Sequence, residues 1–148
     1  MAASVQVCVD NEAVEQRKTW VAYAPHVFVL LALFAVVIGL QWLGHAYRSE
    51  LGGYPDESAH FITGLMIRDY VAAGAPTTPI RYAEDYYFHY PKVAFGMWGP
   101  LLHILEGAWM LIAPSSPNSV LLLMALITTL TAVLLYWTLA REFSIEQP

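Results

Sequence analysis

The chain is short of charge. Only 13% of its 148 residues are Asp, Glu, Lys or Arg, whereas an average soluble domain carries about 25%. Hydrophobic residues make up 57%, above the roughly 45–50% of such a domain. So few charged side chains cannot cover the surface of a water-soluble globule of this size, and a disordered chain would show the opposite bias. The composition therefore excludes an ordinary cytosolic domain and a disordered chain.

Positive charge and cysteine are scarce as well. Seven Lys and Arg against twelve Asp and Glu give a formal net charge of −5. This balance argues against a nucleic-acid-binding protein, which needs a basic face for the phosphates. Cys8 is the single cysteine, so the chain has neither a disulfide framework nor a site built from several thiolates. Of the remaining classes, a membrane protein fits the composition.

Two apolar runs are long enough to cross a bilayer. Val27–Leu43 contains one polar side chain, Gln41, and Val120–Leu139 contains no charged residue. Because a helix rises about 1.5 Å per residue, the second run is about 30 Å long, which matches the hydrocarbon core of a bilayer. We predict an all-α membrane protein with transmembrane helices over residues 20–46 and 118–140.

A third apolar stretch, residues 93–112, is interrupted by small and polar residues. On a helix, Gly96, Gly99, His103 and Glu106 would share one face. The Gly99-Pro100 pair suits a helix that restarts with the proline in its first turn. A charge at bilayer depth would cost about 2.5–3.5 kcal/mol on insertion scales. We therefore predict an amphipathic juxtamembrane helix at about 92–112, with a third membrane span as the alternative.

Lys and Arg beside the two spans set the expected orientation. Arg17 and Lys18 precede the first span and Arg141 follows the last one. Because positive residues favour the cytoplasmic side, we expect a cytoplasmic tail over 1–19, an external loop over 47–117 and a cytoplasmic end over 141–148. The first apolar run exceeds the roughly 7–15 residues typical of a cleaved signal peptide, which indicates a retained anchor.

The external loop contains a first predicted helix over 57–73. Asp56 is suited to the N-cap position, and Glu57 is suited to the first turn, where the helix dipole favours acidic residues. Apolar residues recur along the segment at helical spacing. Gly74 and Pro76 mark its end.

Residues 81–92 (RYAEDYYFHYPK) are rich in aromatic side chains mixed with acids and a histidine. Such rings form belts at a membrane surface. They also line grooves that bind sugars or lipid headgroups. The composition leaves both interpretations open.

Four features follow one another along the chain. They are an apolar span, the run YPDESAH (54–60) opening a helix, the run YFHYPK (87–92) before a second apolar helix, and a span ending in LLYWTLAREF (134–143). In this order they resemble the start of a GT-C superfamily membrane glycosyltransferase, and most of all the bacterial relatives of protein O-mannosyltransferases and the lipid A aminoarabinose transferases. The resemblance covers residues 20–143. In that family the first external loop bears an acidic pair and folds into two juxtamembrane helices.

The resemblance implies a transferase that takes a sugar from a polyprenyl-phosphate donor. Asp56 matches the family's loop carboxylate, which acts as general base on the acceptor hydroxyl or amine, and Glu57 is its candidate catalytic partner. Because Lys92 follows the proline that opens the second helix, His89 or Arg81 could contact the phosphate in its place. The candidate substrate-binding residues are His60, Arg81, His89 and Lys92.

The sequence calls for no cofactor and assigns no metal ligand. A divalent metal beside the leaving phosphate is compatible with it, since the departing anion needs a nearby cation. The spacing of His60, His89 and His103 matches no recognised set of metal ligands. The implied partners are the lipid bilayer, the lipid-linked sugar donor and a remaining enzyme chain, without nucleic acid. The implied location is the bacterial inner membrane, crossed more than once, with the loop facing outward.

GT-C enzymes have many more spans than two, and later external loops complete their donor site. We therefore expect the chain to be the N-terminal portion of such an enzyme, as a fragment, a degenerate copy or one piece of a split assembly, and to be inactive alone. The alternative is a small non-enzymatic membrane subunit that docks a partner through its aromatic external loop.

Overall fold

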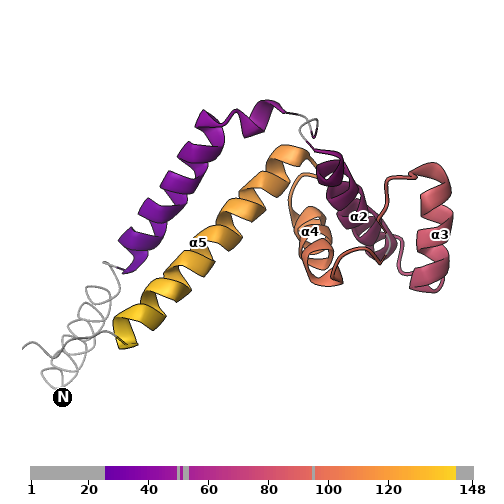
Figure 1. Ribbon diagram of the computed structural model, residues 1–148. Coiled ribbons are helices and arrows are strands. Elements are labelled where there is room, and N and C mark those ends of the chain that lie inside the picture. Colours follow the sequence, from indigo (N-terminus) through magenta and orange to yellow (C-terminus); the bar gives the residue numbers. More distant parts are fainter. Residues whose placement is uncertain (1–25, 50, 52–53, 95, 143–148) are drawn as a thin grey trace, which may run out of the picture. The chain divides into compact units, whose positions relative to one another are not determined.

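A computed structural model describes residues 26–49, 51, 54–94 and 96–142 (Figure 1). Within these ranges every regular element is a helix. The chain divides into two compact units, one made of Ile38–Ile127 and the other of the segments on either side of it. The predicted tail over 1–19, with Arg17 and Lys18, and the last residues 143–148 lie outside the described residues.

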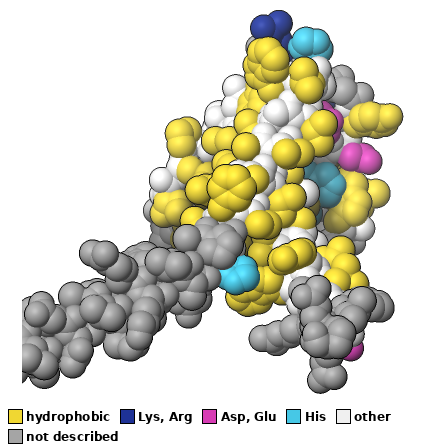
Figure 2. Space-filling model, turned by 90° about the vertical axis from the view of Figure 1, so that its left-hand side faces the viewer, with side chains coloured by type: hydrophobic (Ala, Val, Ile, Leu, Met, Phe, Trp, Pro, Cys, Tyr) yellow, Lys and Arg dark blue, Asp and Glu magenta, His cyan; other side chains and the backbone are white. Residues whose placement is uncertain are grey.

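Two helices are long and apolar enough to cross a membrane, judged by length and composition. They are the first helix, described over His26–Leu43, and Pro117–Leu139 within helix α5 (Pro117–Glu142). Their large side chains are widely exposed, with Phe28 at 72% and Leu134 at 63%. Hydrophobic side chains also predominate on the face shown in Figure 2. The predicted fold class is confirmed at this level: the described chain is all-helical with two candidate membrane-spanning helices.

Local hydrogen bonds explain where α5 begins. The Ser116 hydroxyl accepts a hydrogen bond from the backbone N–H of Ser119 at 3.2 Å, as an N-cap residue does. Pro117 then occupies the first helical position, where its missing N–H is not needed. The indole N–H of Trp109 donates to the Ser119 hydroxyl at 2.8 Å and to the Ser119 carbonyl at 3.0 Å. These bonds tie the start of α5 to the preceding helix.

Gln41, the one polar side chain of the first apolar run, is hydrogen-bonded through both its amide nitrogen and its amide oxygen. Its Nε2 donates to the backbone carbonyl of Leu121 at 3.1 Å, and its Oε1 accepts from the Tyr47 hydroxyl at 2.7 Å. Tyr47 belongs to a 3₁₀ turn, Ala46–Arg48, that follows the first helix. A polar group inside an apolar helix is costly unless it is hydrogen-bonded, so these bonds allow Gln41 to sit near the end of the run.

Between the two long helices lie three shorter ones. They are α2 (Pro55–Ala72), α3 (Pro79–His89) and α4 (Pro100–Ile112). Each begins with a proline in its first turn, where the ring's fixed φ suits a helix start. Helix α2 packs along α4 and makes a smaller contact with α3 (Figure 1). With 13 residues, α4 is about 20 Å long, too short to span a bilayer core.

Helix boundaries differ from the prediction in three places. Asp56 is not the N-cap: Tyr54 takes that position, because Pro55 fits the first helical position and starts α2 earlier. The helix expected from about residue 92 begins only at Pro100, so Gly96 and Gly99 precede it. Within the aromatic-rich segment 81–92, for which no helix was predicted, residues 81–89 belong to helix α3. The end of α2 at Ala72 lies close to the expected residue 73.

Two glycines let α2 and α4 approach closely. A Cβ atom added to Gly64 would lie 2.8 Å from the Glu106 Cβ, and one added to Gly107 would lie 2.9 Å from the Ile67 Cγ2. Neither helix could keep its present distance with a larger residue at these positions. On the other side of α2, Met66, Ala83 and Val93 form a small buried core that joins α2 to α3 and the segment after it.

Candidate functional site

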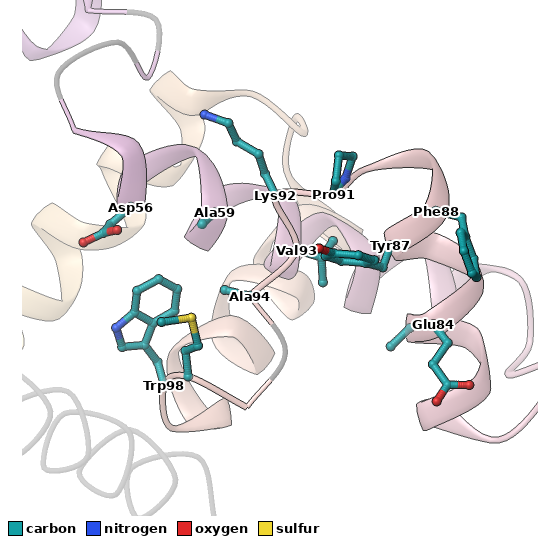
Figure 3. Close-up of a pocket in the computed structure, with 12 residues that line it drawn as sticks. Asp56, Ala59, Glu84, Tyr87, Phe88, Pro91, Lys92, Val93, Ala94 and Trp98 are labelled. Atoms are coloured by element: carbon teal, nitrogen blue, oxygen red, sulfur yellow. The ribbon is translucent and has the colours of Figure 1, made fainter.

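A cavity of about 700 Å³ opens beside α2, α3 and the irregular segment between α3 and α4 (Figure 3). Most of its wall is apolar, and charged groups are few. The lining residues are Asp56, Ala59, Ala83, Glu84, Tyr87, Phe88, Pro91, Lys92, Val93, Ala94, Met97 and Trp98. An apolar cavity with a few charged groups at its edge suits an amphiphilic ligand.

Asp56 and Lys92 provide opposite charges at this cavity. Asp56 lies exposed in the first turn of α2, where the helix dipole favours a carboxylate. The Lys92 ammonium donates to the Ser58 hydroxyl at 3.2 Å, and that hydroxyl donates to the Pro55 carbonyl at 3.0 Å. The chain after α3 thus brings the Lys92 ammonium to the first turn of α2, as Figure 3 shows. An acidic and a basic residue therefore both line one cavity.

Aromatic side chains form much of the remaining wall. In Figure 3, Asp56 and Trp98 lie at one end of the cavity, and Glu84 and Phe88 lie at the other. Phe88 is 83% exposed, and Tyr87 is half exposed. Each end of the cavity therefore combines a carboxylate with an aromatic ring.

The other predicted site residues lie elsewhere. Glu57 lines a separate small cavity of about 190 Å³ that also touches Glu106. Arg81 is exposed on α3 and does not line the larger cavity. His89 ends α3, where its Nδ1 bonds the Asp85 carbonyl at 3.0 Å. Of the six candidate site residues, Asp56 and Lys92 line the larger cavity, and His60 lies behind its wall.

A buried polar cluster lies between α2 and α4. His60 Nδ1 and His103 Nε2 are hydrogen-bonded at 2.9 Å, and His103 is only 2% exposed. Glu106, one turn further along α4, is 3% exposed, and its Oε2 has no hydrogen-bond partner among the described residues. His103 therefore pairs with α2, whereas Oε2 of Glu106 is left unpaired among the described residues.

Burial perturbs the acid–base properties of this cluster. Desolvation, and then the neighbouring His60, lower the pKa of His103 below its ordinary value. Desolvation raises the pKa of Glu106 to about 7. Both shifts favour the uncharged form of the buried group, as expected where water is excluded.

A second set of polar contacts joins α3 to α2. The Tyr86 hydroxyl donates to an Asp69 carboxylate oxygen at 2.9 Å, and the Arg68 Nε lies 2.9 Å from the other oxygen. Burial and the Asp69 carboxylate raise the pKa of Tyr86. Asp69, with Arg68 beside it, therefore helps to hold α3 against α2.

The described residues offer no group of three or more His, Cys, Asp or Glu side chains that could hold a metal ion. His60 and His103 lie together, but His89 is on α3 and bonded to its own helix.

Comparison with known proteins returned no match: no protein-family model, no curated protein and no solved structure resembles this chain. Its function is therefore argued from its own residues and geometry.

The sequence showed only part of the cavity. Asp56 was found through a motif, whereas Trp98 was overlooked because it stands in an irregular segment without periodicity. Tyr87 and Phe88 were noted as aromatic residues, but the wall they form depends on helix α3. A useful signal was the run of aromatic residues followed by Pro91 and Lys92.

Proposed function

We propose that the chain is part of a membrane glycosyltransferase that uses a polyprenyl-phosphate sugar as donor, with Asp56 as general base. The observation that carries the proposal is the joint placement of Asp56 and Lys92 in one largely apolar cavity. Two apolar helices long enough to cross a membrane support a lipid-linked substrate. The resemblance of the ordered motifs to the GT-C superfamily supports the reaction class.

In the proposed reaction Asp56 accepts the proton of an acceptor hydroxyl or amine. The freed oxygen or nitrogen bonds to the anomeric carbon of the donor sugar as the bond from that carbon to the phosphate oxygen breaks. The polyprenyl phosphate leaves as an anion. The Lys92 ammonium offsets its charge, and the aromatic wall takes the apolar part of the donor.

The proposed contact between Lys92 and the donor phosphate is tested by a binding measurement. The full chain in lipid nanodiscs is titrated with a fluorescent short-chain polyprenyl phosphate, and polarisation is measured. We expect Lys92→Ala to weaken binding about ten- to a hundredfold, because a hydrogen bond to a charged group is worth about 1.5–3 kcal/mol. Arg81→Ala is the matched control, since it removes an exposed cation outside the cavity lining. Equal losses in both variants, or equal binding of the phosphate-free polyprenol, would contradict the proposal.

The role of Asp56 is tested by transfer of a radiolabelled sugar. We expect the 148-residue chain to show no turnover alone, since two spans do not enclose a lipid-linked donor. Turnover by the purified chain that Asp56→Asn abolishes would overturn the expected inactivity and support the general base. Turnover that persists in Asp56→Asn would remove Asp56 from the mechanism.

The second candidate function is a non-enzymatic membrane subunit that docks a partner. The exposed aromatic side chains of α3 favour it, above all Phe88 at 83% exposure. Photocrosslinking from residue 88 in native membranes separates the two functions. Crosslinks to one defined protein, together with no binding of polyprenyl phosphate, would favour the subunit.

A further inference from the structure

Trp98 connects the cavity to the buried polar cluster. Its indole lines the cavity, and the His60 imidazole packs against it with ring centroids 4.2 Å apart. His60 in turn stacks on His103 with centroids 5.0 Å apart and an interplanar angle of 19°. Three rings therefore run from the cavity wall to the buried face of α4.

The backbone around Trp98 does little to fix its side chain. Trp98 belongs to the irregular segment between α3 and α4, two residues before Pro100 begins the helix. The segment is held to α2 where the Ala94 N–H donates to the Thr63 hydroxyl at 3.1 Å. Beyond that bond, Gly96 adopts a φ of +78°, a conformation that glycine reaches readily. The indole contacts the His60 ring and lies 6.4 Å, centroid to centroid, from the His103 ring.

The bond between the two imidazoles requires a single shared proton. His60 Nδ1 and His103 Nε2 lie 2.9 Å apart, so one nitrogen donates and the other accepts. A second proton turns both nitrogens into donors, which removes the bond and places two positive rings in contact. Because His103 is 2% exposed, water cannot screen that repulsion.

We propose that His103 is a positioning residue for the cavity: its hydrogen bond holds His60 against Trp98, and protonation of both imidazoles releases the indole from the cavity wall. The position of Trp98 then reports the protonation state of a pair of histidines that the ligand does not touch. This inference concerns the wall alone and does not depend on the reaction proposed above.

Other charged groups surround the pair on both helices. On α2, Asp56 and Glu57 lie within about one turn of His60, and Lys92 reaches Ser58 on the same helix. On α4, Glu106 lies one turn after His103. The part of α5 that lines the small cavity beside Glu106 contributes the uncharged residues Pro117, Val120, Leu121 and Met124. Substitutions at His103 leave all of these charges unchanged.

The test follows the fluorescence of Trp98 in the full chain in lipid nanodiscs. Each protein is measured beside its own Trp98→Phe variant, so that the difference isolates one indole. Iodide quenching of this difference signal is recorded between about pH 8 and about pH 4, because the pKa of His103 lies below the ordinary histidine value of about 6.5. We expect Trp98 to be protected at the upper end and to gain exposure to iodide on acidification.

Two substitutions at His103 decide the outcome. His103→Gln can still hydrogen-bond His60 but does not titrate, so we expect Trp98 to stay protected over the whole range. His103→Leu removes the bond, so Trp98 should be open to iodide at both ends. His89→Gln, on the exposed end of α3, is the matched control. Its Trp98 signal should respond to pH as in the parent chain.

The proposal is overturned if His103→Gln shows the same pH response as the parent chain, or if His103→Leu leaves Trp98 protected. Far-UV circular dichroism of each variant checks that the helices are retained. If His103→Leu loses helix content, the pH responses of His103→Gln and His89→Gln are compared instead. This comparison still tests the proposal, because both variants keep a polar side chain of similar length.

Discussion

At the scale of single residues, Glu106 is the group that most constrains stability. It is 3% exposed, and its Oε2 has no hydrogen-bond partner within the part of the chain that the structure describes. Burial raises its pKa to about 7 from 4.5, so the folded chain keeps the carboxyl protonated where the unfolded chain ionises it. The folded state therefore loses stability as the pH rises from 4.5 to about 7, and above that range the loss is complete.

Replacing Glu106 by Gln removes this titration. We expect Glu106→Gln to be more stable than the parent chain above pH 7, by up to about 3.5 kcal/mol, since each pKa unit is worth about 1.4 kcal/mol. Near pH 4 the two proteins should unfold at the same temperature. The measurement is thermal unfolding in detergent micelles across this pH range. Glu84→Gln, an exposed carboxyl on α3, is the control, and an equal gain there would contradict the assignment.

At the scale of helices, the contact between α2 and α4 rests on small residues. Gly64 and Gly107 face each other across it, and a Cβ on Gly107 would lie 3.1 Å from the Gly64 carbonyl oxygen. This spacing brings His60 within hydrogen-bonding distance of His103. Any widening of the contact would therefore weaken the pair of imidazoles as well as the packing.

Substitution of Gly64 by Ala tests this contact. The new Cβ would lie 2.8 Å from the Glu106 Cβ and 3.2 Å from the Met110 Cε, so the helices must separate. We expect a loss of about 1–2 kcal/mol, because overpacking costs about 1–3 kcal/mol and the better helix propensity of Ala returns up to about 1 kcal/mol. Gly39→Ala, which meets no atom within 4 Å, should be neutral or slightly stabilising. Circular dichroism melting in micelles measures both, and equal melting temperatures would refute the argument.

Sequence reasoning predicted some helices and missed others, for identifiable reasons. The long apolar helices and α2 could be predicted because apolar spacing and flanking Gly74 and Pro76 mark them clearly. Helix α3 was missed although Pro79 fits a helix start and its apolar and polar side chains separate onto two helical faces. The partner of His103 could not be predicted, since His60 is 43 positions away and only the packing of α2 on α4 brings them together.

At the scale of the whole molecule, the proposed topology places residues 47–117 outside the cell. The short length of α4 is in keeping with this arrangement, because 13 residues do not cross a bilayer core. If instead the stretch around α4 crossed the membrane, the connection to α5 would lie on the cytoplasmic side. The exposed Ser115, in that connection, distinguishes the two arrangements.

Cysteine labelling in intact cells tests this topology. In a Cys8→Ser background, Ser115→Cys should react with a membrane-impermeant maleimide added from outside. Ser144→Cys, in the predicted cytoplasmic end, should react only after the cells are permeabilised. Labelling of Ser115→Cys only after permeabilisation, together with labelling of Ser144→Cys from outside, would mean that the stretch 93–112 crosses the membrane.

The tyrosines that hold α3 to α2 give this region an optical signature. Tyr70, Tyr82, Tyr86 and Tyr90 form a row with successive ring centroids 5.2, 5.9 and 4.8 Å apart. At such separations the electronic transitions of neighbouring phenols couple, and fixed rings give a near-ultraviolet circular dichroism band that fluctuating rings do not. The unlabelled protein thus carries its own spectroscopic reporter of whether α3 is docked, readable in any detergent or lipid that is transparent at those wavelengths.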